Sequence, residues 1–260
     1  MNVATLHNQR AQGEVKLHMN AAGIKVLREA GSAKVRLPPG LREAYLINTA
    51  GGIAGGDQFS YEIDLAENTN LVITSQAAER VYQTLGPSAT IQSRIKLAAN
   101  SKLHWIPHET ILFDGAALDR RIHIDMANNA QFLGVEATIF GREASGEKIK
   151  SVVYREDWRI IRSGKLAHAD VISINGAVPN SKATLDDARA MATLILIDPK
   201  AETFVEELQK TIGKNGGASA WNGKLVARFI AKDGMILKKA IVSALSVLAS
   251  PAELPRTWAL

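Results

Sequence analysis

The sequence contains no cysteine among its 260 residues. Disulfides, thiolate nucleophiles, iron–sulfur clusters and cysteine-based zinc sites are therefore excluded together. Any metal ion that this chain handles must be held by histidine, aspartate, glutamate or backbone oxygen. Candidate metal residues are therefore sought among the carboxylates and histidines.

Long hydrophobic runs are also missing. The longest uncharged apolar-rich stretch, residues 240–252, contains three serines and Pro251, and it is shorter than the roughly 18 residues of a membrane-spanning helix. The first ten residues, MNVATLHNQR, carry neither the apolar segment nor the cleavage site of a secretory signal. We therefore expect no membrane span and a cytoplasmic location.

Charge is nearly balanced, with 31 Lys+Arg against 26 Asp+Glu and a formal net charge of +5. This excess favours acidic partners through the long-range field but specifies none of them. Basic residues are scattered, and only Arg120-Arg121 and Lys238-Lys239 are adjacent. Because no basic stripe is interleaved with aromatic residues, nucleic-acid binding is not expected.

Most of the chain alternates between apolar and polar residues, and Val, Ile, Leu, Thr and Tyr carry the pattern. This alternation is typical of β-strands, and Gly, Asn and Ser turns separate the segments. With almost no helix between them, the strands favour stacked sheets over a doubly wound α/β fold. We predict a mainly β, single-domain protein over residues 1–260, with strands at 14–19, 23–28, 33–37, 43–49, 58–65, 70–75, 90–97, 102–106, 121–126, 131–140, 150–161, 165–174, 191–197 and 224–231.

Two segments break this pattern and are predicted to be peripheral helices. Residues 198–212 have Asp198 at the expected N-cap, Pro199 at the first helical position and Gly213 just past the end. Residues 235–248 carry apolar residues at helical spacing. The apolar face of this second helix and residues 255–258 could cover a core or form a partner surface.

The segment 48–58, NTAGGIAGGDQ, has four glycines in six positions after a strand. A phosphate-binding P-loop is excluded because Asp57-Gln58 stands where a Lys-Ser/Thr pair is required. The glycines indicate a tight turn with positive φ angles or a close approach of backbone layers. A functional role for Asp57 at the mouth of this turn is the alternative.

Among the six histidines, only His104 and His108 have ligand-like spacing. Pro107 and the alternating pattern make this segment extended, so the geometry of a helical zinc site fails. Alternation also places Arg121, His123 and Asp125 on one face of a strand, where a polar surface is the simpler interpretation.

Two further acids stand alone on predicted strands. In the strand over residues 131–140, Glu136 falls beside Gly134 and Thr138, opposite the apolar face. A carboxylate beside glycine leaves room for a partner or an ion, although pairing with Arg142 or another arginine is equally open. Asp170 is a similar lone acid. The elbow motif of a serine hydrolase is missing.

Five sequence blocks together resemble the urease accessory protein D family, called H in some bacteria. They are NTAGGIAGGDQ (48–58), TSQAAERVYQT (74–84), WIPHETILFDGAALDRR (105–121), FLGVEATIFGREASGE (132–147) and LPRTW (254–258). Their order and spacing cover nearly the whole chain. Gln58, where many relatives have a second acid, and Arg80, where many have lysine, depart from the family pattern.

The resemblance implies a non-catalytic maturation factor for urease, a nickel enzyme. It implies a scaffold that joins accessory proteins F and G to the urease apoenzyme, and a β-helical arrangement of strands with a polar internal passage. Carried over to this sequence, the resemblance implies that three acids interact weakly with nickel in transit, namely Asp57, Glu136 and Asp170. No tightly bound cofactor is implied, because a delivery path that bound nickel strongly would trap it.

Two other functions stay open from the sequence. A β-helical hydrolase acting on carbohydrate could use a carboxylate pair such as Asp57 and Glu136, which would have to lie about 5 to 10 Å apart in an open cleft. A pure adaptor would hold the partners together while nickel travels elsewhere.

Overall fold

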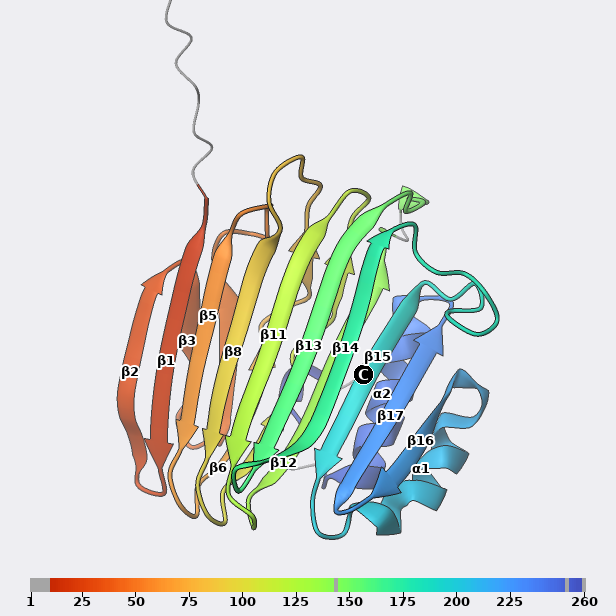
Figure 1. Ribbon diagram of the computed structural model, residues 1–260. Coiled ribbons are helices and arrows are strands. Elements are labelled where there is room, and N and C mark those ends of the chain that lie inside the picture. The colour runs from red at the N-terminus through yellow and green to blue at the C-terminus, as the bar shows by residue number, and fades with distance from the viewer. Residues whose placement is uncertain (1–9, 143–144, 251–252, 259–260) are drawn as a thin grey trace, which may run out of the picture.

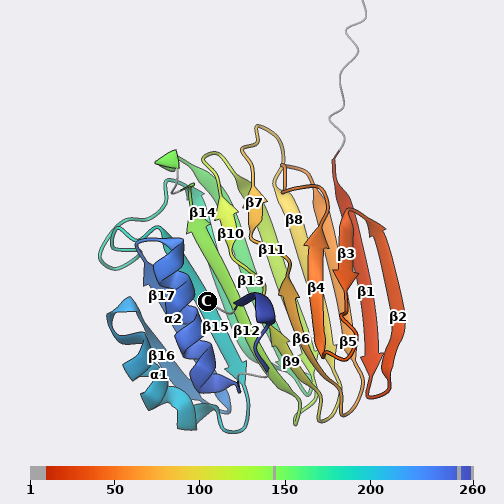
Figure 2. The ribbon, with the colours of Figure 1, turned by 180° about the vertical axis from the view of Figure 1, so that it is seen from behind.

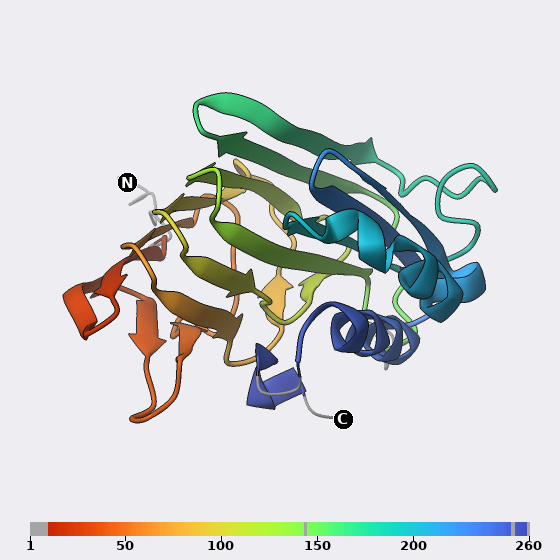
Figure 3. The ribbon, with the colours of Figure 1, turned by 90° about the horizontal axis from the view of Figure 1, so that it is seen from below.

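The computed structural model describes residues 10–142, 145–250 and 253–258. Two β-sheets lie face to face, with the described helices outside one of them (Figures 1 and 3). None of the helices among these residues has the length and apolar character needed to cross a membrane.

The first sheet has seven strands and forms the front layer of Figure 1. In spatial order they are β14 (Lys165–Gly176), β13 (Val152–Arg162), β11 (Ala117–Met126), β8 (Ala89–Leu97), β5 (Gln58–Leu65), β1 (Gln12–Asn20) and β2 (Gly23–Gly31). The strands from β1 through β5, β8 and β11 to β13 are parallel, and antiparallel β2 and β14 flank them.

The second sheet has ten strands and lies behind the first. Its main path is β16 (Gly216–Trp221), β17 (Lys224–Ala231), β15 (Ala190–Ile197), β12 (Gln131–Phe140), β9 (Lys102–Trp105), β6 (Asn70–Ser75), β4 (Glu43–Asn48) and β3 (Ala33–Arg36). The short strands β7 (Glu79–Val81) and β10 (Thr110–Leu112) pair beside β12. The pairings from β4 through β6 and β9 to β12 are parallel.

Between β4 and β13 the chain passes back and forth between the sheets, with β6 and β7, and then β9 and β10, consecutive in the second sheet, so that each circuit stacks on the one before. Registered residues face the same side, and Ile63, Ile95 and Ile124 form one apolar row across β5, β8 and β11. The turns stack as well: Asn100 Nδ2 donates to Asn68 Oδ1 at 3.2 Å, and Asn129 Nδ2 donates to Asn100 Oδ1 at 2.6 Å. The predicted mainly β fold with stacked, β-helical sheets is therefore confirmed.

The two α-helices of the described residues, α1 (Val205–Ile212) and α2 (Gly234–Leu248), lie over β15, β16 and β17 on the outer face of the second sheet (Figure 2). Helix α2 begins one residue before the predicted start at 235, and Asp233 caps it, since Asp233 Oδ1 accepts a hydrogen bond from Ile236 N at 2.7 Å. Short 3₁₀ helices cover Ala201–Phe204, Gly213–Asn215 and Arg256–Trp258.

The predicted start of the first helix is wrong. Asp198 Oδ1 accepts from Lys200 N at 2.7 Å, and Asp198 Oδ2 accepts from Gln131 at 2.6 Å, which holds Asp198 in a turn. The chain then passes through a 3₁₀ turn before α1 begins at Val205. The predicted end is correct, because Gly213 follows the last helical residue with a φ of 55°.

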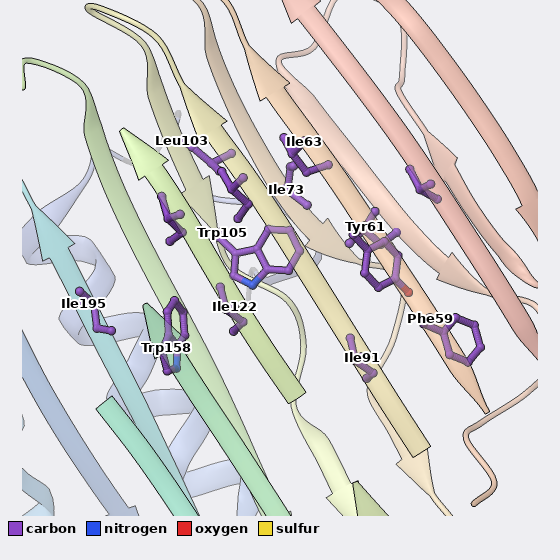
Figure 4. Packing of buried hydrophobic residues seen from close by; sticks show 14 of the residues in the cluster. Phe59, Tyr61, Ile63, Ile73, Ile91, Leu103, Trp105, Ile122, Trp158 and Ile195 are labelled. Carbon is purple, nitrogen blue, oxygen red and sulfur yellow. The ribbon is translucent and has the colours of Figure 1, made fainter. Parts of the chain in front are cut away.

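Two hydrophobic clusters fill the layers. One lies between the sheets, where Tyr61, Ile122 and Trp158 of the first sheet face Ile73 and Trp105 of the second (Figure 4). The other lies between the second sheet and the helices; it includes Val135, Leu194, Phe229, Leu237, Ile241, Leu245 and Trp258. The apolar face of α2 and the C-terminal Trp258 are therefore core, and their alternative as a partner surface is wrong.

Strand β12 belongs to both clusters, because its two faces are both buried. Phe132 faces the space between the sheets, and Leu133 and Val135 face the helices.

The prediction of one domain over residues 1–260 stays a prediction. The sequence missed β7, β10 and β16; the first two have three residues each, too few to show a period.

Candidate functional site

The glycine-rich loop is folded around the buried carboxylate of Asp57. Asp57 Oδ1 accepts from Ala11 N and Oδ2 accepts from Ala54 N, each at 2.8 Å. Gly51 and Gly52 have φ angles of 77° and 146°, which glycine adopts readily and other residues do not. The expected positive-φ turn is confirmed, and the Asp57 carboxylate fastens it to the start of β1.

Glu136 lies on β12 and faces the space between the sheets, as the alternation of that strand predicts. Its side chain is 4% exposed. Trp105 Nε1 donates to Glu136 Oε1 at 2.9 Å, and Arg120 Nη1 donates to Glu136 Oε2 at 2.5 Å. Of the two alternatives for Glu136, an arginine partner or room for an ion, the structure shows the arginine. The partner is Arg120, whereas Arg142 pairs with Glu147.

Arg120 is the centre of a buried polar cluster. Its Nη1 also lies 3.4 Å from Glu156 Oε2, and its Nη2 donates to Thr110 Oγ1. Glu156 accepts in addition from Tyr154 OH at 2.6 Å and from Trp158 Nε1 at 3.0 Å. We call this group the Arg120 cluster; it comprises Trp105, Thr110, Arg120, Glu136, Thr138, Tyr154, Glu156 and Trp158.

The charges in the cluster do not cancel when both acids are ionised, because one guanidinium faces two carboxylates. Burial raises the pKa of Glu136 above its ordinary value, and the negative charge of Glu156 raises it further. Arg120 and the Trp105 indole act in the opposite direction by stabilising the carboxylate. Burial and the second carboxylate prevail over these donors, so the pKa of Glu136 stays raised.

A cavity of about 250 Å³ borders the cluster. Its lining includes Asn48, Glu79, His108, Arg120 and Glu136, together with part of the glycine-rich loop. Asn48 Nδ2 donates to Glu79 Oε1 at 3.1 Å, and burial raises the pKa of Glu79. Acidic groups and one imidazole therefore line a single cavity together with Arg120.

Asp170 lies on β14, at the end of a row of polar residues that starts at Glu136. Glu136 is in register with Thr193, and Thr193 is in register with Arg228. Arg228 donates to Thr193 Oγ1 at 2.5 Å and forms an ion pair with Asp170. The row places Glu136 and Asp170 in one continuous polar strip, whereas Asp57 lies outside this strip and is absent from the cavity lining.

The two histidines with ligand-like spacing do not converge. His104 is on the extended strand β9 and its Nδ1 lies 3.0 Å from the backbone oxygen of Glu253. The His108 ring stacks on Trp258, with ring centroids 5.3 Å apart. Arg121, His123 and Asp125 are exposed on the outer face of β11. Within residues 10–142, 145–250 and 253–258, no three acids or histidines are grouped as a metal-binding set.

Comparison with known proteins identifies the family. The family model described as UreD urease accessory protein matches residues 9–259. The chain belongs to the UreD family of urease accessory proteins. It is 40% identical over 261 residues to the urease accessory protein UreD of Rhizobium johnstonii, with 96% of each chain covered. It is 38% identical over 263 residues to that of Agrobacterium fabrum, covering 97% of this chain and 93% of the relative.

UreD membership makes this chain an accessory protein of urease maturation and not an enzyme. The carbohydrate hydrolase alternative is therefore wrong. Its proposed carboxylate pair is also unsuited to catalysis in an open cleft, because Asp57 is bound to backbone amides and Glu136 to Arg120 and Trp105.

Three charged residues of the site were missed from the sequence, namely Glu79, Arg120 and Glu156. Two of them carried a usable signal: Arg120 is in phase with Ile122 on the apolar face of β11, and Glu156 is in phase with Trp158 on β13. A charged residue in the apolar phase of a strand must be buried with a partner. Glu79 carried no such signal, because β7 is too short to show alternation.

Proposed function

We propose that this chain is a cytoplasmic scaffold that joins accessory proteins F and G to the urease apoenzyme and gives nickel a passage toward the active site of urease. The observation that carries the passage is the cavity of about 250 Å³ that opens to the surface beside exposed Gln76 and Arg80 and is lined by Glu79, His108, Arg120 and Glu136. Family membership supports the role in maturation.

The lining suits an ion that must move on. Nickel accepts carboxylate and imidazole ligands, and a set of three or more would hold it tightly. Glu79, His108 and Glu136 face the same cavity without forming such a set among the described residues. Separate weak ligands replace part of the hydration shell of the ion, and they still let the ion move on through the cavity.

Of the three acids proposed for nickel transit, Glu136 is the one that lines the cavity. Asp170 stands at the far end of the polar row and marks where a path beyond Glu136 would continue. The Asp57 carboxylate accepts two backbone hydrogen bonds. We therefore assign transit first to Glu136, then to Asp170, and we expect Asp57 to act mainly by holding the loop.

The test replaces Glu136 with glutamine, which keeps the volume and removes the charge. The Glu136→Gln variant is co-expressed with accessory proteins F and G and with urease, and nickel per urease active site is measured alongside the pull-down yield of the complex. We expect less nickel in urease at an unchanged yield. Asp125→Asn is the matched control, because Asp125 is an exposed acid on the outer face of β11.

Each other outcome has a defined meaning. Normal nickel with a normal complex would reject the passage and favour a pure adaptor. Loss of both nickel and complex would give Glu136 a structural role, since removing one partner of a buried ion pair costs about 3 to 5 kcal/mol.

A further inference from the structure

The position of Arg120 is that of a cation between two acids. A single nitrogen, Nη1, lies 2.5 Å from Glu136 Oε2 and 3.4 Å from Glu156 Oε2. The two carboxylates come from different sheets, Glu136 from β12 and Glu156 from β13. Both carboxylates and the guanidinium are buried, with side-chain exposures of 4%, 2% and 6%.

We propose that Arg120 is a resident cation that occupies the Glu136–Glu156 site and keeps it closed to divalent metal ions. Its purpose, which rests on the proposed function, is to let nickel pass through the cavity without being retained. The occupancy itself does not depend on that function, because it concerns only which cation the two carboxylates hold.

The charges explain why the site would bind a metal ion if Arg120 were absent. Two carboxyl groups without their guanidinium would lie in a poorly solvated space, where they must either take up protons or pair with another cation. Oxygen ligands from Glu136, Glu156 and Thr110 would then surround the position that Arg120 now fills. A divalent cation that entered from the cavity would compensate them.

Arginine suits this task better than lysine. The guanidinium stays charged at every physiological pH, whereas a buried lysine ammonium loses its proton more readily. Its planar group also reaches several acceptors at once, and here Nη1 serves both acids while Nη2 donates to Thr110. Nickel in the cavity therefore meets acids that Arg120 already neutralises in part, so that Glu136 attracts the ion only weakly and does not retain it.

The experiment measures nickel binding by equilibrium dialysis of the full-length chain against nickel sulfate. We expect Arg120→Met to bind one nickel ion per chain about 10- to 100-fold more tightly than the wild type, because one opposing charge at contact distance is gone. Arg121→Met should resemble the wild type, and Arg120→Lys should fall between the wild type and Arg120→Met, because a buried lysine loses its proton more readily. Arg121 is the matched control, as it is 60% exposed on the same strand.

The double variant Arg120→Met/Glu136→Gln identifies the ligands. It should lose the gain in nickel affinity, because only one carboxylate remains. The proposal is wrong if Arg120→Met binds nickel no more tightly than the wild type, or if the gain survives in the double variant. Magnesium sulfate should give no comparable gain, because magnesium gives up its water reluctantly and demands a near-ideal octahedral site.

Arg120→Met could fail to fold because it leaves two buried acids uncompensated. In that case the unfolded variant is diluted from urea with and without nickel sulfate. Recovery of folded protein with nickel alone supports the proposal. Recovery in neither condition, while the double variant refolds, contradicts it.

The two proposals fail separately. Normal urease nickel with Glu136→Gln rejects the passage but leaves the nickel affinity of Arg120→Met unchanged. Wild-type affinity in Arg120→Met rejects the resident cation, and it leaves the effect of Glu136→Gln on urease nickel intact.

Discussion

Replacing Asp57 with alanine tests whether this acid acts on folding. In the wild type, the two carboxylate oxygens of Asp57 accept from Ala11 N and Ala54 N, each at 2.8 Å. These contacts join the glycine-rich loop to the start of β1. Asp57→Ala removes both acceptors at once and leaves two backbone donors without their partner.

The expected loss follows from those two bonds. A hydrogen bond to a charged group contributes about 1.5 to 3 kcal/mol. Ala11 and Ala54 are only half-buried, so water replaces part of what is lost. We therefore expect Asp57→Ala to lower the free energy of unfolding by about 2 to 4 kcal/mol. Asp57→Asn should lie between the variant and the wild type, because the amide keeps one acceptor oxygen.

Urea unfolding followed by tryptophan fluorescence measures this difference. Asp125→Ala is the control, since the Asp125 side chain is 51% exposed, and its loss should change the free energy of unfolding by less than about 0.5 kcal/mol. The structural argument is refuted if Asp57→Ala is as stable as this control. Reduced urease nickel in such a stable variant would return Asp57 to a role in transit.

Two further predictions concern the C-terminal segment. Trp258→Ala should cost about 3 to 5 kcal/mol of stability, because the indole is buried and also donates to Ile106 O. Thermal unfolding measures this loss. The control is Trp221→Ala, which should cost less than about 1 kcal/mol because the Trp221 side chain is exposed. Burial would raise the pKa of Glu253, but hydrogen bonds, first among them that of Lys102, lower it to about 2. The ionised Glu253 therefore stabilises the fold above the unfolded value of 4.5, and this stabilisation is lost as pH falls toward 2. Over this pH window the stability of Glu253→Gln should fall less steeply than that of the wild type, and equal slopes would contradict the lowered pKa of Glu253.

The fold could be predicted because most strands are long enough to alternate. The predicted strand over residues 131–140 coincides with β12, and its two faces are the two cores. Turn residues were equally informative, since Asn68 and Asn100 adopt φ angles of 57° and 56°. The pairing order could not be obtained in this way, because alternation fixes which face is buried and not which strand lies beside which.

The site was predictable only in part, because burial of a charge depends on partners from distant parts of the chain. Glu136 was identified from its small neighbours on β12. Arg120 was overlooked because the predicted strand began one residue later, at Arg121, whereas β11 begins at Ala117. The phase of β11 separates them: Arg120 is inward with Ile122, and Arg121 is outward with His123.

What distinguishes the buried acids is the kind of donor that holds each of them. The donors to Asp57 are backbone amides, which cannot leave the carboxylate unless the loop itself opens. The donors to Glu136 are side chains of Arg120 and Trp105, which come from different sheets. Glu136 also lines the cavity, so that a passing ion can approach it without any loop opening. The sequence shows both residues as acids beside glycine, and only the structure separates an acid that holds a loop from one that lines the cavity.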